Sequence, residues 1–141
     1  MKGRGGQRGT ALAEFALAWP VLLLAVLGAI ELGVWSAEAF AARSAAVSGA
    51  RAGAVAGGGA AIAQAVALTA LRPSLAGAPL TGWCPQPSRP PPPGVWVCGR
   101  DLGTAIEVVV GGAVPALVPL VPSGAGLPLA ADVAVPKAVF G

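Results

Sequence analysis

The sequence predicts an α+β protein in which a long N-terminal transmembrane helix continues outward and precedes a small antiparallel sheet with a disulfide loop. Three observations support this fold class. An uncharged apolar run begins at Phe15, and an alanine-rich stretch without proline follows it as far as Leu71. Beyond Pro73, short segments with strand-like patterns are separated by Pro and Gly.

Composition sets the first limits on function. The 141 residues are 55% hydrophobic and only 11% charged, which is too apolar for an ordinary soluble domain and favours a membrane or an assembly. The nine Lys and Arg residues are scattered, and His and Tyr are absent, so we expect no nucleic-acid partner. Carboxylates are spread singly along the chain. We therefore expect a protein that is not an enzyme and that uses no metal and no cofactor.

The apolar run has the length of a membrane span. Residues 15–30 include 16 residues without a charge, and if Glu31 is tolerated the run continues to Trp35. Its 21 residues would make roughly 31 Å of helix, enough to cross a bilayer despite Pro20. The charges before the run are all basic: Lys2, Arg4 and Arg8. The positive-inside rule predicts a single-pass protein with its N-terminus in the cytoplasm and everything after Trp35 exported.

Two simpler interpretations of this run remain open. It could be an uncleaved signal anchor, or a secretory signal peptide cleaved near residues 37–41, where small residues gather. The run is long for a signal peptide, and Glu31 lies between it and that cleavage site. Both features weigh against the signal peptide.

Glu14 discriminates among these interpretations, because a simple anchor gains nothing from a carboxylate at the start of its apolar run. A charge at the bilayer centre costs about 2.5 to 3.5 kcal/mol on insertion scales, and less near the interface. A favourable interaction with the helix dipole, worth about 0.3 to 1 kcal/mol, would explain why Glu14 is tolerated. It would not explain the glycine five residues earlier.

The segment from Gly9 to Phe15 reads G-x-x-x-x-E-F ahead of an apolar helix and resembles a prepilin peptidase site. Cleavage after Gly9 would leave Thr10 as the new N-terminus and Glu14 as its fifth residue. The freed α-amino group is cationic near neutral pH and needs an anionic partner in an apolar bundle. Glu14 of an adjacent subunit would supply that charge and set the axial register between subunits.

Residues 8 to about 53 resemble the TadE-like family, the pilin-like proteins of tight-adherence (Tad) pilus assembly. The resemblance is carried by "RGTALAEFAL", by "PVLLLAVLGAIELG" and by "ARSAAVSGARAGA", in that order. It implies a pilin-like fold and a minor pilin or pseudopilin in the bacterial inner membrane. The implied partners are the lipid bilayer, a prepilin peptidase, other pilin-like subunits and the Tad assembly machinery.

The sequence divides into four regions. Residues 1–9 form a basic leader, 10–35 the transmembrane helix, 36–72 an outer helical region with a glycine hinge at 57–59, and 73–141 a small β-rich domain. Strands are expected at 95–98, 104–110 and 130–135, with 73–82 as a loop and the proline-rich stretch 115–128 as an extended connection. An apolar stripe in the outer helical region is expected to pack on these strands or on a neighbouring subunit: Phe40, Val47, Val55, Ile62 and Val66.

Cys84 and Cys98 are the only cysteines and lie in the exported region, so we expect them to form a disulfide. Prolines 90–93 fall inside the loop that this bond would close, where they could act as a rigid spacer or as a docking surface. The docking alternative defines a rival function. In that case the protein is a membrane-anchored binding module, and its helix is only a tether.

Overall fold

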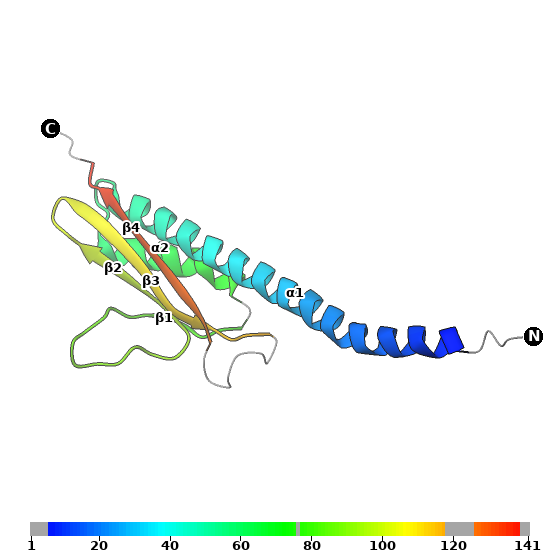
Figure 1. Ribbon diagram of the computed structural model, residues 1–141. Coiled ribbons are helices and arrows are strands. Elements are labelled where there is room, and N and C mark those ends of the chain that lie inside the picture. The colour runs from blue at the N-terminus through cyan, green and yellow to red at the C-terminus, as the bar shows by residue number, and fades with distance from the viewer. Residues whose placement is uncertain (1–5, 76, 118–125, 139–141) are drawn as a thin grey trace, which may run out of the picture.

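The computed structural model of the protein describes residues 6–75, 77–117 and 126–138, with side chains from residue 13 onward. One long helix projects from a small domain and runs along it with its outer half (Figure 1). The elements are α1 (Gly6–Ala54), α2 (Ala60–Leu71), a 3₁₀ turn η1 (Arg72–Ser74), β1 (Leu80–Gly82), β2 (Val95–Asp101), β3 (Ala105–Val114) and β4 (Leu127–Pro136).

The sheet has the strand order β1-β2-β3-β4. β2, β3 and β4 pair antiparallel, with Cys98 opposite Val109 and Val109 opposite Asp132. The predicted fold class is confirmed: a long apolar helix precedes a small sheet. The three predicted strands are present, and each is longer than expected. Pro128 lies in β4, an edge strand, where a missing backbone donor is tolerated.

The prediction that the sheet is antiparallel throughout is wrong for its first strand. β1 lies within residues 73–82, which were expected to form a loop, and it pairs parallel to β2, with Leu80 opposite Val95. A three-residue strand is too short to show a period in the sequence. Its pairing also depends on a partner far along the chain rather than on a hairpin turn. In the predicted connection at 115–128, residues 118–125 lie outside the described part of the chain.

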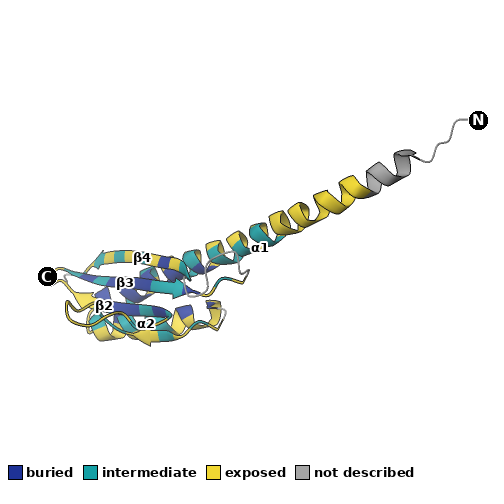
Figure 2. Ribbon diagram, turned by 60° about the horizontal axis from the view of Figure 1, so that its bottom comes forward, coloured by how far each residue is buried: buried dark blue, intermediate teal, exposed yellow. Residues whose placement is uncertain are grey.

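The glycines at 57–59, expected to form a hinge, lie between the two helices. α1 ends at Ala54 and α2 begins at Ala60, so residues 57–59 lie in the break between them. Gly57 has a φ of 79°, a left-handed conformation that glycine adopts without steric cost. The break lets α2 fold back against α1, and both helices cover one face of the sheet (Figures 1 and 2).

The face of α1 that packs into the core consists of alanines. Its buried members are at most 7% exposed: Ala42, Ala45, Ala46, Ala50 and Ala54. The bulk of the core comes from the sheet and the end of α2, where the largest buried side chains are Leu71, Val95, Val97, Ile106, Val108, Val110 and Leu129. Small side chains on the helix let its backbone approach the sheet closely, and the strands fill the remaining volume.

Three of the five residues of the predicted apolar stripe are exposed rather than packed on the protein's own strands, while Val47 and Val66 are half-buried. Phe40 is 76% exposed, Val55 is 59% exposed and Ile62 is 46% exposed. Helical periodicity alone identified a face of large apolar residues, whereas the structure buries the small ones. The reason is steric: the facing strands already carry large β-branched residues, so the close-packed side of the helix must be small.

The predicted disulfide between Cys84 and Cys98 is present. It ties the chain just after β1 to the middle of β2. Val95 and Val97 are buried toward the helices, so Trp96 and Cys98, which alternate with them, point to the other face of the sheet. There Trp96 packs edge-on against Trp83, with ring centroids 5.3 Å apart, and covers Gly111.

The β2–β3 turn is held by charged groups at one end of the sheet. The Asp101 carboxylate accepts a hydrogen bond from Gly103 N at 2.8 Å and lies 2.7 Å from Lys137 Nζ. The hydrogen bond from Lys137 lowers the pKa of Asp101. Arg100 and Glu107, 3.4 Å apart, lie at the same end. This charged end of the sheet lies away from the N-terminal half of α1 (Figure 1).

The close packing of α1 on α2 leads to a stability prediction for Gly49. A Cβ built on Gly49 would lie 2.5 Å from Ala63 O and 2.8 Å from the Ala67 Cβ atom. We expect Gly49→Ala to lower the free energy of unfolding by about 1–3 kcal/mol, because the helices must move apart. The midpoint of chemical denaturation in detergent, followed by near-ultraviolet circular dichroism, measures this change.

Gly33→Ala is the matched control, because a Cβ at Gly33 meets nothing within 4 Å. Its denaturation midpoint should be unchanged or higher, since alanine favours a helix interior over glycine by roughly 0.5–1 kcal/mol. Equal midpoints for the two variants would show that the contact between α1 and α2 is not tight.

Candidate membrane and assembly surface

The N-terminal half of α1 exposes large apolar side chains in every direction. Between 47% and 77% of each is exposed: Phe15, Leu17, Trp19, Val21, Leu22, Leu23, Leu24, Val26 and Ile30. α1 is long and apolar enough to cross a membrane over Ala13–Ala54. Figure 2 shows this segment free of the domain, with exposed residues on all sides. A helix that is apolar all round requires apolar surroundings, which a bilayer or a bundle of similar helices provides.

The predicted processing residues lie at the N-terminal end of α1. The helix begins at Gly6, so the backbone of Gly9 and Thr10 is helical, while their side chains lie outside the described set. Glu14 is exposed and makes no hydrogen bond or ion pair with any residue that the structure describes. Phe15 stacks on Trp19 one turn later, with ring centroids 5.9 Å apart. The carboxylate and the aromatic pair therefore lie together, on the part of the helix that projects from the domain.

The C-terminal end of the apolar segment is joined to the sheet domain by two polar contacts. The Glu31 carboxylate accepts the backbone N–H of Leu117, with distances of 3.0 and 2.9 Å to its two oxygens. The Trp35 indole donates to the carbonyl of Pro128 at 3.0 Å. Glu31 and Trp35 are four residues apart and lie on the same face of the helix. Residues 31–35, which the sequence placed in the span, thus lie beside the domain.

Sequence reasoning did not assign Glu31 a role in the site. The available signal was its position at the end of an apolar run, four residues before a tryptophan that can also hydrogen-bond. The partner, Leu117, could not be found from the sequence, because 86 residues separate it from Glu31. The predicted site residues fall into two groups along the molecule: the four processing positions in α1, and Cys84 with Cys98 in the outer domain.

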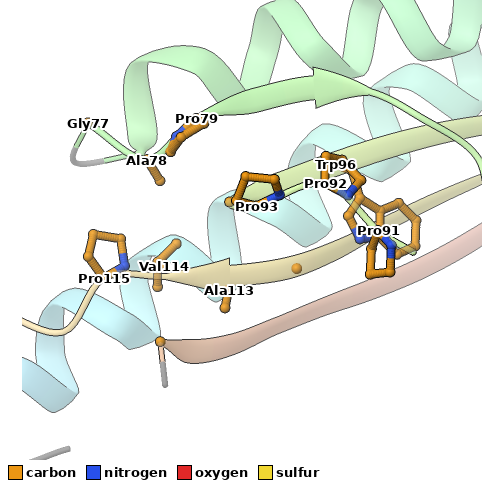
Figure 3. A pocket seen from close by; sticks show the side chains of 13 residues that line it. Gly77, Ala78, Pro79, Pro91, Pro92, Pro93, Trp96, Ala113, Val114 and Pro115 are labelled. Carbon is orange, nitrogen blue, oxygen red and sulfur yellow. The ribbon is translucent and has the colours of Figure 1, made fainter. Parts of the chain in front are cut away.

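A shallow pocket of about 720 Å³ lies at one end of the sheet. Figure 3 shows Pro91 and Pro92 beside Trp96, with Pro93 between them and Pro79. None of the described residues that line this pocket has an ionisable side chain. The pocket therefore offers an apolar, rigid surface and no acid, base or nucleophile.

A long apolar helix that continues into a small disulfide-bonded sheet domain defines a pilin-like architecture. Within that class, residues 9–55 match the family model described as TadE-like protein. This match confirms the resemblance seen in the sequence for that segment of the chain. It spans most of α1 and stops one residue beyond it. Comparison with curated proteins and with solved structures gave no match.

Proposed function

We propose that the protein is a minor pilin or pseudopilin of a Tad-type pilus or secretion apparatus. It is inserted in the bacterial inner membrane with its N-terminus in the cytoplasm and its sheet domain outside. The observation that carries this proposal is the exposed Glu14 at the inner end of an apolar helix that the sheet domain leaves uncovered. The family match of residues 9–55 supports it.

In this proposal a prepilin peptidase cuts between Gly9 and Thr10. The bond lies in the first turns of α1, so the peptidase must unwind the helix locally. Glycine is about 1 kcal/mol less favourable than alanine inside a helix, so the free-energy cost of unwinding the helix at Gly9 is lower than at an alanine. Cleavage removes the basic leader and creates a cationic α-amino group at Thr10.

The new amine and Glu14 then act together between subunits. Both must enter an apolar environment when helices assemble, and each charge is costly there without a partner. Pairing the amine of one subunit with Glu14 of the next neutralises both. It also fixes how far one helix is displaced along its neighbour, which is the register that a fibre requires.

A second candidate is the membrane-anchored binding module, and the pocket lined by Pro91–Pro93 and Trp96 favours it. In that case the proline-rich loop, closed by Cys84 and Cys98, contacts the partner. Glu14 separates the two functions, because a pilus subunit needs its carboxylate and a tether does not.

The processing step predicts that the mature protein begins at Thr10. N-terminal sequencing of protein isolated from cells measures the start. Gly9→Val should leave the leader attached, whereas Gly6→Ala, three residues upstream, should be processed normally. A start at Met1 would instead support the signal anchor, and a start near Ala42 the signal peptide.

The intersubunit pair predicts that Glu14→Ala inserts normally but does not assemble, since a neighbour's amine loses its anionic partner. Glu14→Gln keeps the shape of the side chain and should fail in the same way. Sheared surface fibres are measured in a strain that lacks the wild-type copy, with membrane fractionation to follow insertion. Glu107→Ala, which removes a carboxylate of the outer domain, should assemble. Normal fibres from Glu14→Ala would exclude the intersubunit role.

A further inference from the structure

One end of the sheet carries no charged residue in its strands or their flanking residues, although Arg72 of η1, which follows α2 and precedes β1, is exposed. β1 and β2 begin there, β3 ends there and β4 begins there, since Leu80 pairs with Val95 and Val114 pairs with Leu127. No residue in the ranges 77–80, 91–96, 112–117 and 126–129 is charged. At the opposite end lie Arg100, Asp101, Glu107 and Lys137. The sheet itself is therefore polarised along the direction of its strands.

The uncharged end is the one attached to α1 next to the exposed apolar segment. The backbone N–H of Leu117 donates a hydrogen bond to the Glu31 carboxylate, and the Trp35 indole donates one to the carbonyl of Pro128. We call the exposed residues at this end the proximal rim: Pro79, Pro93, Pro115, Leu117 and Pro128. Leu117 is 58% exposed although it lies in a loop beside a helix, so its side chain has surface available for another contact.

The chemistry of the rim suits a lipid interface. Four of its five residues are prolines, which have no backbone N–H to leave unsatisfied when water is displaced. Its one large aliphatic side chain is that of Leu117, whose backbone is bonded to Glu31. Leu117 therefore extends the apolar surface of α1 beyond Glu31 onto the sheet domain. We propose that the proximal rim rests on the outer surface of the bilayer, with Leu117 inserted among the lipid headgroups and upper acyl chains.

This placement sets the outer boundary of the hydrocarbon at Glu31. A loop and a strand end cannot lie in hydrocarbon, because their backbone polar groups would lack partners. Counting inward from Glu31, the roughly 20 residues that a bilayer core requires reach Ala11. Glu14, some 26 Å from Glu31 along the helix axis, then falls inside the inner boundary. There it needs the neutralising partner described above.

The inference rests on the membrane insertion of α1 in the proposed function, and the experiment separates the two. The full-length protein is reconstituted into phosphatidylethanolamine and phosphatidylglycerol vesicles with a nitroxide on one introduced cysteine: Leu117→Cys, Leu102→Cys or Leu23→Cys. Leu102 is the matched control, a leucine 54% exposed in the turn between β2 and β3 at the charged end. Cys84 and Cys98 are bonded to each other and do not take the label.

Relaxation by oxygen, which concentrates in lipid, is compared with relaxation by a water-soluble nickel chelate. The ratio of nitroxide relaxation by oxygen to relaxation by the nickel chelate should be several-fold higher at position 117 than at 102, and highest at 23. Equal ratios at 117 and 102, with 23 in lipid, would overturn the rim placement and leave the proposed function intact. Protection of 117 from both reagents would mean that protein covers the rim, which also overturns it. A water-like signal at 23 would overturn membrane insertion itself.

Discussion

The structure depends on a single continuous helix that must satisfy two different surroundings. Over Gly6–Ala54 the helix does not break, so the environment of its inner half fixes the position of the domain carried by its outer half. The inner half presents large apolar side chains to its surroundings, and the outer half presents alanines to a sheet. The glycines that end the helix come only after Ala54. The two halves of α1 therefore form one rigid rod.

The alanine face has consequences for the rest of the domain. Because the helix contributes little volume to the core, the strands must supply it with Val, Ile and Leu. Gly49 and Gly53, which lack a side chain, let α2 approach the backbone of α1 closely as well. A core of this kind buries modest apolar area, and the Cys84–Cys98 bond adds stability on the opposite face of the sheet. In the chain-entropy model a loop of this size contributes about 3 kcal/mol.

Much of the architecture was predictable from local patterns in the sequence. The apolar run, the glycine break and the alternation of Ile106, Val108 and Val110 each carry a signal within a few residues. The disulfide followed from the presence of two cysteines in an exported region. These features need no knowledge of distant contacts.

What the sequence did not reveal depends on long-range pairing. β1 exists because Leu80 meets Val95 across a loop, and the contact of Glu31 with Leu117 spans 86 residues. The sequence also did not reveal which face of α1 is buried in the domain, because that choice depends on the strands that face it. Helical periodicity points to the helix face with the largest apolar side chains. The side chains on the facing strands decide whether large or small helix residues can pack there.

The two carboxylates at the ends of the apolar segment differ in how they are satisfied. Glu31 receives a backbone N–H from its own chain, whereas Glu14 has no described partner within it. The central claim is therefore that Glu14 pairs with the amine of a neighbouring chain. The most direct measurement is zero-length cross-linking by a membrane-permeant carbodiimide in cells shifted from light to heavy isotopic medium, so that protein made before and after the shift is present together. The account predicts an amide between Thr10 of one isotopic form and Glu14 of the other, found by mass spectrometry. Modified Glu14 beside an unlinked Thr10 amine in assembled material would contradict it.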